Sequence, residues 1–173
     1  IKKTIGSKSV LLGTVVGCSP VSLMADFDMI DAHSYWYHPV FPGNSWNRND
    51  YYVWNRTLTK GEFAPQLTGL ATKRVFGKPF SVTEFDHPYP NQFSAEMYPM
   101  TAAFACMQDW DALFSFSSDL PGGMPTGKEK ISHFFDQSDN PVKTAAVPVA
   151  ARIFRNFMVP PAEKSVFLEV SKR

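Results

Sequence analysis

The chain has 173 residues, of which 44% are hydrophobic and 19% are charged, a composition typical of a folded globular domain. Its 17 basic and 16 acidic residues leave a net charge of +1, and this balance gives no broad electrostatic reason for binding nucleic acid. The sequence also has no apolar run near the roughly 20 residues that a membrane-spanning helix needs. We therefore expect neither nucleic acid nor a membrane as a partner.

Four short apolar runs predict β-strands at residues 10–16, 29–34, 80–84 and 112–116. The first run follows basic residues, but it is short, β-branched and broken by glycines, so a buried strand fits it better than a secretion signal. Residues 20–27 fit a short helix capped by Ser19 and a plain loop equally well.

Helices are predicted over residues 67–76, 94–110 and 140–157. The first ends before Gly77, which is typical of a helix stop. Ser94 is suited to cap the second helix, whose apolar positions at helical spacing are Met97, Met100, Phe104 and Met107. The third helix has Pro148 as the place for a kink, and one side of it carries Val142, Ala146, Val149, Ile153 and Phe157.

Strands that alternate with helices predict an α/β fold with a parallel sheet, covered by helices on at least one face. Four such units make half of a (β/α)8 TIM barrel, since a closed barrel takes about 250 residues. We therefore expect residues 1–158 to form half a barrel, with Ile1 at an interior position of a longer protein. Residues 159–173 are predicted to be a linker and then the first strand, 166–170, of a following β-domain.

The two cysteines, Cys18 and Cys106, lie far apart and have no CxxC or ligand-like spacing, so the sequence predicts no disulfide framework. The four histidines also match no standard metal-ligand spacing. We expect neither a metal ion nor another cofactor.

Glu84 stands at the carboxyl end of the third predicted strand, where the chain enters a loop stiffened by Pro88 and Pro90. In a TIM barrel this end of the strands faces the active site. An ionised carboxylate on an apolar strand is costly unless it is hydrogen-bonded or used, which makes Glu84 a candidate catalytic residue. The alternative is a structural bridge between Glu84 and a buried Arg or Lys.

The second predicted strand continues into a polar and aromatic stretch. Strand alternation places His33 and Tyr35 on one face, and Ala32, Ser34 and Trp36 on the other. An imidazole or a phenol beside Glu84 would donate a hydrogen bond that keeps the carboxylate ionised and oriented. The alternative is that His33 is a satisfied core histidine and Tyr35 packs.

The long loop at residues 39–60 interleaves aromatic and polar side chains, and its aromatic members include Trp46, Tyr51, Tyr52 and Trp54. Aromatic faces cover the C–H side of a sugar ring while Asn and Asp bind its hydroxyls, so this composition favours carbohydrate. Packing of the tryptophans on a neighbouring domain is the alternative.

Three segments resemble the last strands of clan A glycoside hydrolases, especially the β-galactosidase-like and cellulase-like enzymes: 31–36 (Asp-Ala-His-Ser-Tyr-Trp), 82–91 (Val-Thr-Glu-Phe-Asp-His-Pro-Tyr-Pro-Asn) and 108–116 (Gln-Asp-Trp-Asp-Ala-Leu-Phe-Ser-Phe). The resemblance implies strands five to eight of the barrel, a retaining mechanism and Glu84 as the nucleophile. It implies a carbohydrate substrate, for which the candidate binding residues are His33, Tyr35, Trp36, Trp46, His87 and Asn91.

The chain departs from the pattern of this clan in two ways. The last predicted strand runs into Ser117-Ser118-Asp119, without the tryptophan that often floors the sugar site. The acid/base Glu of the clan would fall before Ile1, so we expect the isolated chain to be inactive and to need the N-terminal half of the same barrel as its partner. A secreted or periplasmic location is favoured if the parent carries a signal peptide. The rival functions are a non-catalytic carbohydrate-binding or interaction domain, and another barrel enzyme that uses Glu84 as a general base.

Overall fold

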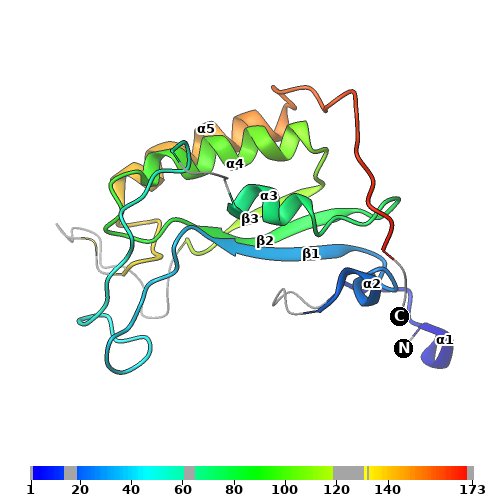
Figure 1. Ribbon diagram of the computed structural model, residues 1–173, viewed down its shortest axis with the longest axis horizontal. Helices are drawn as coiled ribbons and strands as arrows, with labels where there is room; N and C mark the ends of the chain where they lie inside the picture. Colours follow the sequence, from blue (N-terminus) through cyan, green and yellow to red (C-terminus); the bar gives the residue numbers. More distant parts are fainter. Residues whose placement is uncertain (1, 14–18, 61–64, 119–130, 132, 171–173) are drawn as a thin grey trace.

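The computed structural model describes residues 2–13, 19–60, 65–118, 131 and 133–170, and its helices and strands alternate along the chain (Figure 1). Three parallel strands form an open sheet in chain order: β1 (Ile30–Tyr35), β2 (Phe80–Asp86) and β3 (Ala112–Ser115). The predicted α/β class and the parallel sheet are therefore confirmed.

The predicted strand at residues 10–16 is described only in its first part. Leu12 forms an isolated parallel bridge with Met29, just ahead of β1, and the Gly13 N–H donates to the Met29 carbonyl over 3.2 Å. Residues 14–18 of this prediction, and with them Cys18, lie outside the described residues. A short helix precedes this segment, α1 (Lys2–Ile5), and another follows it, α2 (Val21–Met24). The N-cap of α2 is Pro20, not Ser19 as the helical alternative required.

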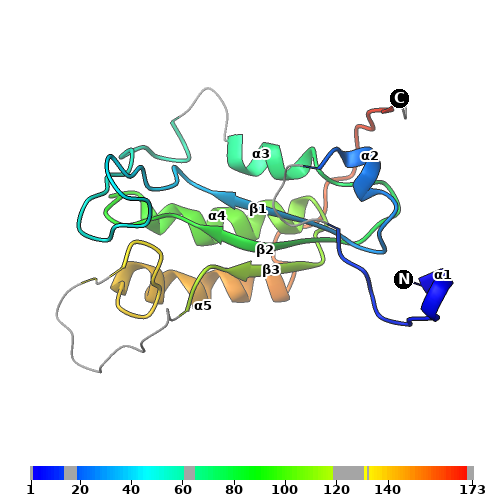
Figure 2. The same cartoon turned by 90° about the horizontal axis from the view of Figure 1, so that it is seen from below.

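Three further helices lie on one face of the sheet: α3 (Pro65–Ala71), α4 (Ser94–Met107) and α5 (Pro141–Arg155) (Figures 1 and 2). They cover the apolar side chains of the strands, including Ile30 and Ala32 from β1 and Phe80, Val82 and Phe85 from β2. The opposite face carries no helix within the described sheet region, as the view from below shows (Figure 2). One face of the strands is therefore apolar and covered by helices, and the other face has no helix over it within the described residues.

The helix boundaries and the buried faces correct the sequence predictions in detail. Helix α3 ends at Ala71, several residues before the left-handed Gly77 (φ 73°). Ser94 is the first residue of α4, whose N-cap is Phe93. In α5 the predicted apolar side is confirmed in part: Ala146 and Ile153 pack against the core, whereas Val142 and Val149 are exposed and Lys143 and Ala150 are buried. Lysine is almost never fully buried unless it is paired, so the sequence predicts an exposed Lys143. Its burial is explained by the ion pair with Asp86 that is described below.

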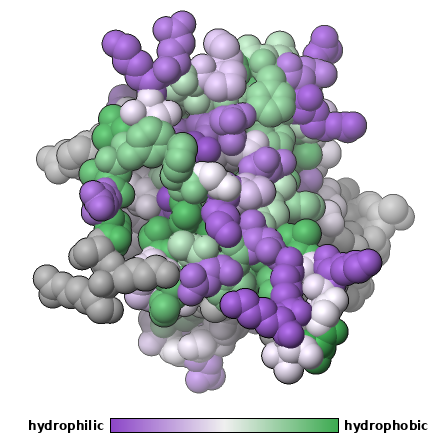
Figure 3. Space-filling view, turned by 90° about the vertical axis from the view of Figure 1, so that its right-hand side faces the viewer, coloured by the Kyte–Doolittle hydropathy of each residue, from purple (hydrophilic) through white to green (hydrophobic). Residues whose placement is uncertain are grey.

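Residues 166–170 were predicted to be a strand, but the structure gives them no regular secondary structure and places them on the surface. Phe167 contacts Phe76 there, with ring centroids 4.8 Å apart. Figure 3 views this end of the molecule, where hydrophobic residues lie between hydrophilic ones. A β-strand needs a neighbouring strand for the hydrogen bonds of its backbone, and residues 166–170 have none here. A following β-domain therefore stays a prediction. None of the described helices is long and apolar enough to cross a membrane.

Candidate functional site

The helix-free face of the sheet carries a row of polar side chains because β2 contains a bulge. Residues Ala32 and His33 of β1 pair with Val82 and Glu84, so Thr83 is an extra residue on β2. A bulge re-aims the side chains around it, and here both Thr83 and Glu84 contact His33. Strict alternation would have placed them on opposite faces of the sheet.

Glu84 accepts two contacts on the same carboxylate oxygen. The Tyr35 hydroxyl donates to Oε2 over 2.6 Å, and His33 Nδ1 lies 3.2 Å from the same atom. Burial, followed by the hydrogen bond to Glu84, raises the pKa of Tyr35, so the phenol stays protonated and serves as a donor. No hydrogen bond to Oε1 is found among the described residues, and the Glu84 side chain is 33% exposed. Oε2 is therefore held by two side chains, while Oε1 has no hydrogen bond among the described residues.

Behind His33 the polar row continues into the sheet. Thr83 Oγ1 lies 2.9 Å from His33 Nε2 and 2.6 Å from Asp31 Oδ2. The other Asp31 oxygen accepts the Ser81 hydroxyl, and the Asp31 side chain is fully buried. The bulge therefore links a buried carboxylate to the exposed Glu84 through one threonine and one histidine.

An aromatic cluster continues from Tyr35 towards the loop at residues 39–60. The Tyr35 ring lies 4.9 Å from that of Phe135 and 6.0 Å from that of Phe116, measured between centroids. Phe135 contacts His38 in turn, and Trp46 contacts both of these residues. Trp46 is 60% exposed. The structure thus brings Glu84, His33, Tyr35 and Trp46 to one side of the molecule.

Trp36 and Asn91 have a different position, in which they hold the loop rather than face solvent. The buried Trp36 ring donates its N–H to the Arg56 carbonyl over 2.8 Å. Asn91 Nδ2 lies 3.0 Å from the Trp54 carbonyl and 3.1 Å from that of Arg56. Glu96 from α4, which the sequence analysis did not single out, binds the same loop through the Thr57 hydroxyl and the Leu58 N–H. These groups support the loop that carries Trp46, and a role for Trp36 and Asn91 in contacting substrate stays a prediction.

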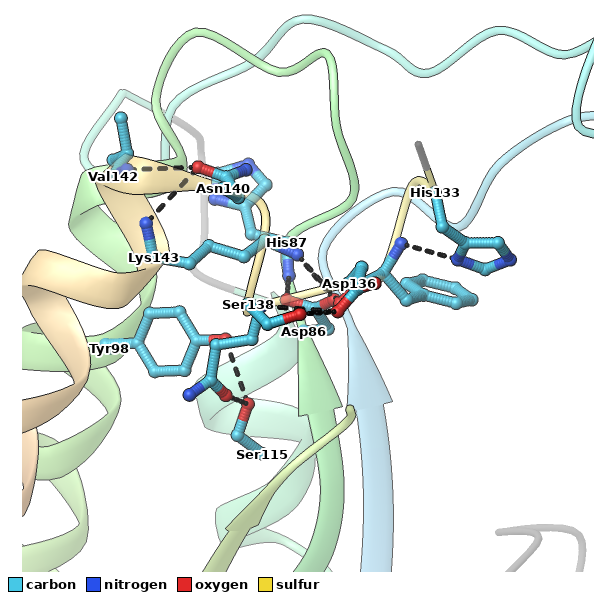
Figure 4. A network of polar contacts seen from close by, with 12 residues as sticks. Asp86, His87, Tyr98, Ser115, His133, Asp136, Ser138, Asn140, Val142 and Lys143 are labelled. Atoms are coloured by element: carbon cyan, nitrogen blue, oxygen red, sulfur yellow. Dashed lines mark hydrogen bonds and ion pairs between the residues drawn. The ribbon is translucent and has the colours of Figure 1, made fainter. Parts of the chain in front are cut away.

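A second polar network lies at the end of β2, on the side of the helices (Figure 4). Lys143 of α5 donates to Asp86 Oδ2 over 2.7 Å and to the Phe135 carbonyl over 3.2 Å. Both charged side chains are 0% exposed. Burial raises the pKa of Asp86 and lowers that of Lys143, while their mutual attraction opposes both changes. Sequence reasoning missed this pair because its members are 57 positions apart. The pair fixes the segment that carries Phe135 against Tyr35.

His87 follows Asp86 and is fully buried beside Trp36, with ring centroids 6.1 Å apart. Its side chain is therefore not exposed to solvent, and its predicted contact with substrate stays a prediction. Burial first, and then the positive charge of Lys143, lower the pKa of His87 to about 3. The folded chain therefore holds a neutral imidazole over most of the pH range.

The buried neutral His87 predicts a loss of stability in acid. In the unfolded chain this group titrates near its ordinary pKa of 6.5, so its contribution is present above that pH and is lost as the pH falls towards 3. Between pH 7 and pH 5 the free energy of unfolding should fall by about 2 kcal/mol from this group. Urea unfolding at the two pH values measures the fall. His87→Leu should reduce it by that amount, and an unchanged difference between the two pH values would contradict the assignment.

Among the described residues, no group of three or more His, Cys, Asp or Glu side chains is placed to hold a metal ion. Cys106 is a free, buried thiol within the core. No known protein family, no curated protein and no solved structure matches this chain. The site therefore has to be interpreted from its own geometry.

Proposed function

We propose that this chain is part of a retaining glycoside hydrolase and supplies its nucleophile, Glu84. The observation that carries the proposal is the pair of contacts on Glu84 Oε2, from the Tyr35 hydroxyl and His33 Nδ1, while Oε1 has no hydrogen bond among the described residues and the side chain is 33% exposed. A nucleophilic carboxylate needs this arrangement, with one oxygen fixed by donors and the other directed at the reacting carbon. A Glu84 that served as a structural bridge would instead contact a buried Arg or Lys. Among the described residues, the side chains that contact its carboxylate are Tyr35 and His33.

We further propose that the sheet is the C-terminal half, strands five to eight, of a (β/α)8 barrel. The order of the three strands follows the chain, and the Leu12–Met29 bridge extends this order by one more parallel partner. Doubly wound sheets reverse their strand order and carry helices on both faces, whereas a barrel keeps chain order and has helices outside only. The helix-free face, which carries Glu84, would then line the barrel interior.

The reaction follows from these positions. Glu84 Oε1 attacks the anomeric carbon of a sugar, while a second carboxyl group protonates the departing glycosidic oxygen. A glycosyl ester forms on Glu84, and the second group then removes a proton from the water that hydrolyses it. The two carboxyl groups of a retaining enzyme lie about 5 to 5.5 Å apart.

The second carboxyl group is proposed to come from the N-terminal half of the barrel. Three carboxylates near the site already have other partners: Asp31 binds Ser81 and Thr83, Asp86 binds Lys143, and Glu96 binds the loop at residues 39–60. An acid/base group has to be free to exchange its proton with substrate and water. The isolated chain is therefore expected to turn over aryl glycosides negligibly.

The substrate class follows from the cluster beside Tyr35. Trp46 is exposed and contacts Phe41, His38 and Phe135, so an exposed aromatic surface continues the cluster that begins at Tyr35. Such a surface suits the C–H face of a pyranose. Oligosaccharides or polysaccharides longer than one sugar would reach from Glu84 to this surface.

Covalent labelling tests the proposal. The full-length polypeptide should be incubated with 2-deoxy-2-fluoro glycosyl fluorides of gluco, galacto and manno configuration, which trap the glycosyl-enzyme of a retaining glycosidase. Peptide mass mapping should then find one fluorosugar on Glu84. Turnover without a label, or a label on another carboxylate, would remove Glu84 from this role. Sugar binding without turnover or label would favour the non-catalytic carbohydrate-binding alternative.

A further inference from the structure

A second group of exposed aromatic side chains lies on the loop that carries Trp46, separate from the Trp46 cluster. Tyr52 is 46% exposed and Trp54 is 50% exposed, and their ring centroids are 6.0 Å apart. The neighbouring Tyr51 contacts Phe134 instead, and Trp46 contacts Phe134 as well. Tyr52 takes part in an antiparallel bridge, and successive side chains of such extended backbone point to opposite faces. Tyr52 and Trp54 therefore form a surface of their own.

Arg56 adds a positive charge to this surface. Its guanidinium carbon lies 5.7 Å from the centroid of the Trp54 ring and 5.6 Å from that of the Tyr37 ring. Arg56 is exposed, and among the described residues no Asp or Glu lies within ion-pair distance of it. Its one side-chain hydrogen bond in this part of the chain is from Nη1 to the Tyr37 hydroxyl, over 3.4 Å. A guanidinium that lies over aromatic rings still has N–H groups at its edge that can bind an anion.

The backbone that carries these side chains is held in place by hydrogen bonds. The Asn91 amide donates to the carbonyls of both Trp54 and Arg56. Between them, Asn55 donates to Gln92 Oε1 over 3.0 Å and accepts from the Gln92 N–H over 2.9 Å. All three loop residues nevertheless expose their side chains. Exposed side chains on a fixed backbone are suited to bind a ligand, because little ordering of the loop is then needed on binding.

Tyr37 has an uncommon backbone conformation beside Arg56. Its φ is 51°, in the left-handed region that residues with a Cβ rarely adopt. Such conformations are found preferentially at catalytic and ligand-binding sites. The ring of Tyr37 packs against the buried Trp36, with centroids 5.1 Å apart and at an angle of 84°. The ring over which Arg56 lies is therefore fixed on the core.

We propose that Tyr52, Trp54 and Arg56 form a second binding site, which takes a uronic acid unit of an acidic polysaccharide. The rings cover the C–H face of the sugar, and Arg56 binds its carboxylate through the N–H edge. A planar carboxylate matches a planar guanidinium with two parallel hydrogen bonds. That the ligand is a carbohydrate rests on the proposed function. The site does not include Glu84, so it holds a stretch of the glycan other than the one that reacts.

Calorimetric titration tests this site in the full-length protein carrying Glu84→Gln, which keeps the ligand from being consumed. The probes are tetramers of galacturonic, glucuronic and mannuronic acid, each compared with its methyl ester. At least one acid should bind, and its ester should bind at least about tenfold more weakly, because the ester has no charge for Arg56. Raising the ionic strength from about 0.1 M to about 1 M should weaken binding of the acid, since salt screens exposed charges.

Substitutions in the same background assign the binding to these residues. Arg56→Gln and Trp54→Ala should each weaken binding of the acid by at least about tenfold. Arg56→Lys keeps the charge without the planar guanidinium, so it should have a smaller effect. Each of the Arg56 variants keeps the backbone carbonyl that accepts from Asn91, and the unfolding midpoint should therefore not change. Arg74→Gln, the matched control, removes another exposed arginine and should leave the affinity unchanged.

Three results would overturn this proposal. They are equal affinities of Arg56→Gln and its parent, binding of none of the acidic tetramers, and equal binding of an acid and its ester. A sulfated galactan tetramer, which has no carboxylate, should bind more weakly than the best uronate, and tighter binding would contradict the assignment to uronic acids. Full catalytic activity of Glu84→Gln would instead remove the proposed nucleophile, and the result of the binding titration would stand.

Discussion

Glu84→Gln in the full-length protein should lower kcat for aryl glycoside hydrolysis by about 10⁴-fold or more, with little change in the folded structure. The amide has nearly the shape of the carboxylate and keeps an oxygen that can accept from Tyr35, but it cannot form the glycosyl ester. Loss of the nucleophile removes the pathway itself, and comparable losses follow the removal of nucleophiles in other enzymes. Steady-state kinetics with a chromogenic glycoside measures the fall.

The control is Glu163→Gln, which makes the same chemical change at an exposed glutamate in the tail and should keep wild-type kcat. A nucleophile and an acid/base residue both cost activity when removed, so a second experiment separates them. In Glu84→Ala, azide should restore turnover from the vacated side of the sugar and give a glycosyl azide of inverted anomeric configuration. A product of retained configuration would assign Glu84 to the acid/base role, and unchanged kcat in Glu84→Gln would exclude it from the mechanism.

The strands of this fold could be predicted from the sequence, because each depends on a short local pattern of apolar residues. Strands β1, β2 and β3 were expected within a residue or two of their observed bounds, because each is a short apolar run beside turn residues. The position of Glu84 near the end of β2 follows from the same pattern, and alternation along β1 brings His33 and Tyr35 to it.

The features that sequence reasoning missed depend on distant residues. The bulge at Thr83 is visible only in the pairing of β1 with β2, and without it Thr83 would not reach His33. The packing of Trp36 in the core and its hydrogen bond to the Arg56 carbonyl were also missed, while its contact with sugar stays a prediction. The burial of Lys143 depends on Asp86, so a lysine on the buried face of α5 could not be found from helical periodicity alone. In each case a contact between separate elements overrides the local signal.

Lys143→Met should destabilise the protein by about 3 to 5 kcal/mol, the largest effect on stability that we expect from a single substitution. The change leaves Asp86 fully buried and without its cation, although the His87 N–H still donates to Oδ1 over 2.7 Å. The Phe135 carbonyl also loses a donor, so the aromatic cluster beside Tyr35 should loosen. Urea unfolding of the full-length protein at pH 7, followed by tryptophan fluorescence, measures the free energy of unfolding.

The double variant Lys143→Met with Asp86→Asn distinguishes an uncompensated charge from lost packing. It removes both charges while the Asn oxygen can still accept from the His87 N–H, so most of the lost stability should return. Arg152→Met, which removes an exposed cation from the same helix, should change stability by less than about 0.5 kcal/mol. If the double variant stayed as unstable as Lys143→Met, the loss would come from the side chain's packing and its bond to Phe135. The ion pair would then have no net effect on the stability of the fold, and the Phe135 contact alone would explain why α5 buries a lysine beside the candidate site.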